Sequence, residues 1–177
     1  MKFSTDYSQM LSSFQQQTQI PDLQLEEAAS LTLSCILLNL GKQSMNGIGQ
    51  RKISSQIDNF SETQLTAYQA NISEHLAGGE QMLASMLPGI KSSIVRVVMN
   101  RYKIKYSYTC QLIDFCTCVA MIQLKEKIRN EKWDFHNLLV DFFHSKQQVW
   151  ELVSDLNKNE IATLGIKPYL VALNHQK

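Results

Sequence analysis

The sequence contains little glycine and little proline: 7 and 3 among 177 residues. Strand-like alternation of apolar and polar residues is nearly absent. Apolar residues instead recur at helical spacing almost throughout. Together these features predict an all-α fold.

The chain also lacks an excess of charge of either sign. Its 17 Lys and Arg against 16 Asp and Glu give a formal net charge of +1, so no global field attracts nucleic acid or an acidic membrane. The first residues, MKFSTDYSQML, lack the apolar stretch of a secretory signal, from which we expect a cytoplasmic protein. The longest apolar region, 112–124, is interrupted by polar residues and falls short of the roughly 20 that a bilayer helix requires. We therefore expect no membrane span.

Three of the four cysteines lie in one apolar run, YTCQLIDFCTCVAM, at 108–121. A thiolate metal site needs sulfurs about 2.3 Å from one ion. On one helix Cys116 and Cys118 point about 200° apart, and Cys110 lies roughly 12 Å from Cys118 along the axis. They cannot share an ion, and the sequence has neither a Cys-x-x-Cys pair nor a glycine-rich phosphate loop. We expect no metal and no cofactor, and cysteines that belong to the hydrophobic core.

An enzyme that uses a cysteine and a histidine is one alternative. Its nucleophile would be Cys110 or Cys118, beside a histidine that is distant in the sequence. No local signature marks any histidine for this role, and burial among apolar neighbours raises the pKa of a thiol and suppresses its thiolate. We therefore expect no enzymatic activity and assign no catalytic residue.

Helical periodicity predicts one domain, 1–177: a single compact bundle of about seven to nine helices. The helix at 107–129 is expected to be central and buried, because apolar residues cover most of its circumference. Asp22 is expected to cap a helix that runs to Gly41. The pair Gly78-Gly79 is expected to end another helix.

Basic and aromatic residues alternate in RYKIKYSY, from 101 to 108. A platform for single-stranded nucleic acid uses cations for the phosphates and rings for stacking. Its candidate residues here are Arg101, Lys103, Lys105 and Tyr106. The competing explanation is structural, because bases favour the negative C-terminal end of a helix and tyrosines pack between helices. Nucleic-acid binding therefore stands as the alternative function.

Two segments carry a family resemblance: AGGEQMLASMLPGIKSSIVRVVMNRYKIKYSYTCQLIDFCTCVAMIQLKEKI, and WDFHNLLVDFFHSKQQVWELVSDL followed by LGI. They resemble the YidB-like family of bacterial all-helical domains of unknown function, although His144-Ser145 stands where that family has a glycine pair. The resemblance implies a bacterial, all-helical, non-enzymatic protein. It divides the domain into N-terminal helices at 1–76, a YidB-like part at 77–166 and a tail at 167–177.

The function favoured by the sequence is a non-enzymatic protein-binding or adaptor domain in the bacterial cytosol. A helical domain without convergent polar residues acts through a groove or an exposed helix face, so we expect an exposed apolar patch of several hundred Å². Candidate contacts are Trp133, Trp150 and Tyr169, since large aromatic residues anchor partners. The partner stays open between a secretion-system adaptor or chaperone role, a toxin-neutralising role and a homo-oligomer.

Overall fold

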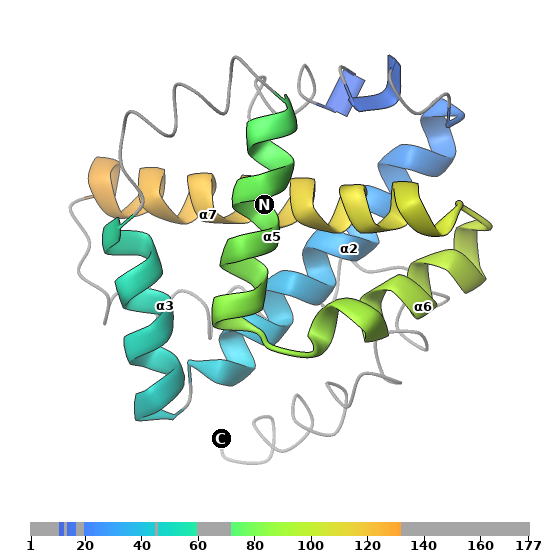
Figure 1. The fold of residues 1–177 in the computed structure, drawn as a ribbon. Helices are drawn as coiled ribbons and strands as arrows, with labels where there is room; N and C mark the ends of the chain where they lie inside the picture. Colours follow the sequence, from blue (N-terminus) through green and yellow to red (C-terminus); the bar gives the residue numbers. More distant parts are fainter. Residues whose placement is uncertain (1–10, 13, 17–19, 45, 60–71, 132–177) are drawn as a thin grey trace, which may run out of the picture.

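The computed structural model describes residues 11–12, 14–16, 20–44, 46–59 and 72–131, and for 22, 72–77 and 129–131 it describes the backbone alone. Within these ranges every regular element is a helix, which confirms the all-α prediction for the described part. The number of helices in the whole chain and its division into domains stay predictions. The main helices are α2 (Asp22–Gln43), α3 (Gly47–Asn59), α5 (Ile72–Met86), α6 (Ile90–Tyr102) and α7 (Tyr106–Glu131) (Figure 1).

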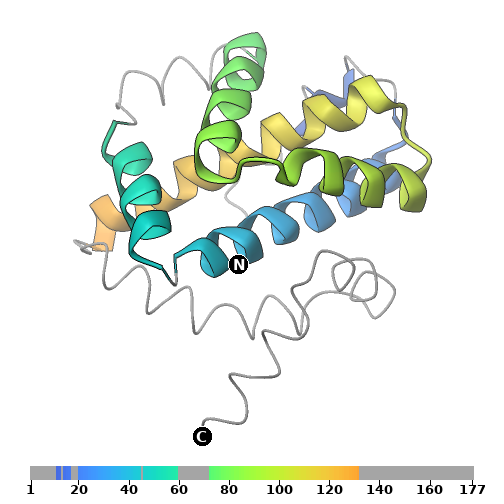
Figure 2. The ribbon, with the colours of Figure 1, turned by 60° about the horizontal axis from the view of Figure 1, so that its bottom comes forward.

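Helix α7 lies between α5 on one side and α2 on the other, and it also contacts α3 and α6 (Figures 1 and 2). It was predicted over 107–129 and extends over 106–131. All side chains from 112 to 122 are buried, including those of Asp114 and Thr117. The hydroxyl of Thr117 donates a hydrogen bond to the Ile113 carbonyl at 2.8 Å, so burial leaves this hydroxyl satisfied.

Helix α2 corrects two predictions about its ends. Asp22 is not the N-cap but the first helical residue, and Pro21 holds the cap position with no side-chain hydrogen bond. Proline suits this place, because its fixed φ requires no ordering and its missing N–H would find no helical partner. The helix also passes Gly41 and ends at Gln43, where the hydroxyl of Ser44 donates to the Gly41 carbonyl at 2.7 Å.

Helix α5 contradicts the predicted break at Gly78-Gly79. It runs through both glycines, which are buried, and ends at Met86. A Cβ atom on Gly79 would overlap the carbonyl oxygen of Asp114 in α7 and lie 2.6 Å from the carbonyl carbon. The pair therefore does not end the helix, and Gly79 allows the backbones of α5 and α7 to approach closely.

The chain turns sharply between α5 and α6. Gly89 takes a left-handed conformation, with φ of 80°, immediately before α6 begins at Ile90. Helix α6 buries Ile94, Val95, Val98 and Tyr102, which confirms the helix that these four residues predicted. It ends at a second left-handed residue, Lys103, whose N–H donates to the Met99 carbonyl at 2.9 Å.

None of the described helices is long and apolar enough to cross a bilayer alone. The segments Gly78–Met86 and Ile90–Tyr102 would qualify together by length and composition, but they are bent by 115° relative to each other.

A candidate basic interface at the turn between α6 and α7

The cysteines of α7 belong mainly to the core. Cys116 and Cys118 are completely buried, as predicted, whereas Cys110 is only half-buried and packs against the edge of the core. The Cys116 thiol faces the Ala29 carbonyl of α2, with 3.7 Å between sulfur and oxygen. Burial raises the pKa of Cys35 and of Cys118 to about 12 and also raises that of Cys116. These three thiols are protonated at neutral pH and poor nucleophiles.

Metal-ligating side chains do not converge in the described part of the chain: no three of His, Cys, Asp and Glu are arranged to hold an ion there. The histidines that a Cys/His enzyme would need provide no test of that alternative. His136, His144 and His175 lie outside the described residues, and only the backbone of His75 is described.

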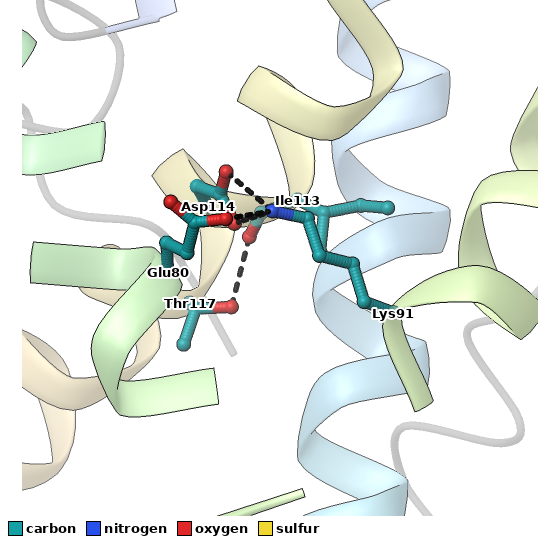
Figure 3. Close-up of polar contacts among 5 residues, drawn as sticks. All are labelled: Glu80, Lys91, Ile113, Asp114 and Thr117. Atoms are coloured by element: carbon teal, nitrogen blue, oxygen red, sulfur yellow. Dashed lines mark hydrogen bonds and ion pairs between the residues drawn. The ribbon is translucent and has the colours of Figure 1, made fainter. Parts of the chain in front are cut away.

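A partly buried ion-pair network joins α5, α6 and α7. The ammonium of Lys91 lies 2.7 and 2.8 Å from the two carboxylate oxygens of Asp114, and 3.3 Å from Oε1 of Glu80 (Figure 3). The Asp114 side chain is only 9% exposed, against 29% for Lys91. Sequence reasoning missed this network, because the two main partners are 23 residues apart and no local pattern connects them.

The network affects the pKa of both main partners. Burial raises the pKa of Asp114, and the hydrogen bond and charge of Lys91 offset this only in part. For Lys91, burial acts to lower the pKa, but the hydrogen bonds and charges of Asp114 and Glu80 outweigh it and the pKa is raised. The charge of Lys91 is therefore neutralised by acids of the same chain, and we do not count Lys91 among the bases that are available to a partner.

Residues 81–113 contain five basic residues and no acidic one. Apart from Lys91, the bases are exposed and no ion pair joins them to an acid of the described residues. We use the name basic corner for five exposed residues: Arg96 in α6, and Arg101, Lys103, Lys105 and Tyr106 at the turn between α6 and α7. The structure thus brings the four residues predicted from the RYKIKYSY pattern to one exposed turn, and it adds Arg96, which stands outside that pattern.

Tyr106 differs from the other tyrosines nearby. Tyr102 is buried and Tyr108 half-buried, as the structural explanation expects, but Tyr106 is 65% exposed. A hydrogen bond with Cys110, one turn further along α7, raises the pKa of Tyr106. Lys105 lies with its ammonium 6.0 Å from the centre of the Tyr108 ring. The turn therefore presents an accessible ring, that of Tyr106, directly after Lys103 and Lys105 in the sequence.

The expected apolar groove is not supplied by the large hydrophobic side chains of the described residues. Those that are exposed, Leu23, Ile48 and Tyr106, each stand in the first turn of a different helix. The other predicted contacts, Trp133, Trp150 and Tyr169, lie outside the described residues.

Comparisons with protein-family models, with curated proteins and with solved structures find no match for this chain. The resemblance to the YidB-like family therefore stays an expectation from the sequence.

Proposed function

We propose that this chain is a non-enzymatic protein-binding domain, an adaptor, that receives an acidic segment of its partner on the basic corner. The observation that supports the proposal is the exposure of four bases that no described acid neutralises, together with one exposed aromatic ring at the turn. Complementary charge guides association and suppresses wrong partners, and Arg and Tyr are enriched among residues that dominate binding energy.

A purely structural role does not explain all of these bases. Arg101 and Lys103 stand at the C-terminal end of α6, where a cation is favourable. Lys105 instead directly precedes the first residue of α7, at the positive end of that helix dipole, and Arg96 is in the middle of α6. The helix dipole therefore explains neither base. Lys105 has a contact within its own chain, with the Tyr108 ring, whereas Arg96 is an exposed base that is available to a partner.

The finer expectations from the sequence belong to the same proposal. The domain would be a single bundle of about seven to nine helices around α7, acting in the bacterial cytoplasm without a cofactor. Trp133, Trp150 and Tyr169 would extend the contact surface from the part of the chain that is not described.

Fluorescence anisotropy of a labelled twelve-residue poly-glutamate peptide tests the proposal. The native chain should bind the peptide at low salt, with an affinity that falls steeply as salt rises. The variant Arg101→Glu/Lys103→Glu/Lys105→Glu should lose this binding.

The matched control for net charge is Lys42→Glu/Arg51→Glu/Lys52→Glu, which reverses three exposed bases on α2 and α3. It should bind the peptide nearly as well as the native chain. Equal loss in both triple variants would contradict the proposal, because overall charge and not the basic corner would then control binding.

Single-stranded nucleic acid is the second candidate partner, favoured by the exposed ring of Tyr106 that directly follows the exposed bases Lys103 and Lys105. A base stacked on such a ring contributes about 1–3 kcal/mol. A labelled twenty-nucleotide oligothymidine should then bind more tightly than the acidic peptide, and Tyr106→Ala should weaken this binding by about fivefold or more. That pair of results would replace the protein partner by a nucleic acid.

A further inference from the structure

The exposed face at the start of α2 carries charge opposite to that of the basic corner. Leu23, Glu26 and Glu27 stand at positions i, i+3 and i+4 and share one side of the helix. All three are exposed, Leu23 by 69%. No ion pair joins the two glutamates to a base of the described residues. We call these three residues the acidic face.

The acidic face and the basic corner belong to the same end of the helices. Helices α2 and α7 meet where the Cys116 thiol faces the Ala29 carbonyl. Leu23 precedes that contact by six residues and Tyr106 by ten, or about 9 and 15 Å along their helices. The start of α2 and the turn between α6 and α7 lie at one end of the structure in both views (Figures 1 and 2).

We infer that the partner on the basic corner is a second copy of this chain. In a two-fold symmetric dimer the acidic face of each copy would pack on the basic corner of the other. This inference rests on the proposed function and names the partner of the same surface.

Symmetry is what makes the pairing of these two surfaces informative. A two-fold interface must be complementary to itself, since each contact occurs twice with the roles exchanged. Here exposed acids and exposed bases lie at the same end of the structure and are not paired with each other, which meets this requirement. Each surface also has an exposed hydrophobic residue, Leu23 or Tyr106, that a partner would remove from water.

The third exposed hydrophobic residue, Ile48 on α3, has no such counterpart. Its exposed neighbours Arg51 and Lys52 are both basic. Two copies of that face would repel each other, so it is not used for self-association in this arrangement and it provides a control surface.

Sedimentation velocity of the full chain over a range of concentrations tests the inference. At low salt the native chain should form a species of twice the 20.2 kDa chain mass and dissociate as salt is raised. Glu26→Lys/Glu27→Lys and Arg101→Glu/Lys103→Glu/Lys105→Glu should each remain at monomer mass. Arg51→Glu/Lys52→Glu on the control surface should still dimerise.

Mixing the two interface variants gives the sharpest result. One variant then has two basic surfaces and the other two acidic ones, so an equimolar mixture should recover a dimer that neither variant forms alone. Circular dichroism of each variant separates loss of dimer from loss of fold.

Two results would overturn the dimer. One is a native chain at monomer mass throughout, and the other is a dimer that both interface variants retain. If the monomeric chain still binds the poly-glutamate peptide, the dimer fails and the proposed function stands. If it neither dimerises nor binds the peptide, both fail.

Discussion

Gly79 in α5 lies against the carbonyl group of Asp114 in α7, with no room between them for a Cβ atom. The side chain of the same Asp114 binds Lys91 of α6. One residue of α7 therefore positions two other helices, α5 through its backbone and α6 through its carboxylate. The position of the basic corner depends on these contacts of α7 with α5 and α6, because α6 leads directly into the turn that carries the corner.

The close approach of α5 to α7 at Gly79 predicts that a single methyl group added there lowers the stability of the fold. In Gly79→Ala the new Cβ would overlap Asp114, and shifting a packed backbone costs about 1–3 kcal/mol, more than the gain of about 1 kcal/mol in helix propensity. Urea denaturation should show a lower free energy of unfolding. Gly47→Ala, at a site with no neighbour within 4 Å, is the control and should change stability by less than about 0.5 kcal/mol. An alanine variant at 79 as stable as the native chain would show that the helices do not pack so closely.

Loss of the Lys91 ammonium should destabilise the fold. Lys91→Met would leave the buried carboxylate of Asp114 without its partner, a change that costs several kcal/mol in a fully buried pair. Because the Lys91 side chain is 29% exposed, we expect about 2 kcal/mol by urea denaturation. The double variant Lys91→Met/Asp114→Asn should recover part of this loss, since it removes the unpaired charge. A double variant less stable than the sum of the two single changes would contradict this explanation.

The raised pKa of Asp114 predicts an unusual pH dependence for this one group. Because the folded state holds this proton more tightly than the unfolded state, the stabilisation is complete below the ordinary pKa of 3.8. It is lost as pH rises through the raised folded pKa. Relative to Asp114→Asn, the native chain should therefore lose stability with rising pH in this window. Chemical denaturation at a series of pH values measures the difference, and carboxyl NMR titration of Asp114 gives its pKa directly; a pKa below 3.8 would contradict the prediction.

Thiol labelling should separate the four cysteines. Cys110 is half-buried, whereas Cys35, Cys116 and Cys118 are buried and have a raised pKa. Under native conditions a thiol reagent should label Cys110 alone, and the other three should react only in denaturant. Cys110→Ser should abolish native labelling. Rapid labelling of Cys118 in the folded chain would instead revive the Cys/His enzyme.

Local periodicity is sufficient to place several helices of this protein. The continuous apolar pattern of α7 predicted its extent to within two residues at either end, and the spacing of Ile94, Val98 and Tyr102 predicted α6 despite its β-branched residues. A helix repeats every 3.6 residues, so its buried side can be recognised from neighbours along the chain. The position of the bases Arg101, Lys103 and Lys105 at a helix end and the following turn was predicted from the flanking pattern in the same way.

For some residues the local sequence is compatible with two structural roles, and only the tertiary structure decided between them. A glycine can end a helix, and it can also allow two helices to approach closely. The sequence around Gly79 does not show that α7 packs against it. The pairing of Lys91 with Asp114 joins positions 23 residues apart, and it decides which base of the 81–113 stretch is used internally. The amino-acid sequence by itself determined an all-helical fold in the described residues and a locally basic turn, because both depend on neighbours along the chain. Which helices touch, and which charges remain for a partner, depend on contacts between distant residues that appear only once the chain is folded.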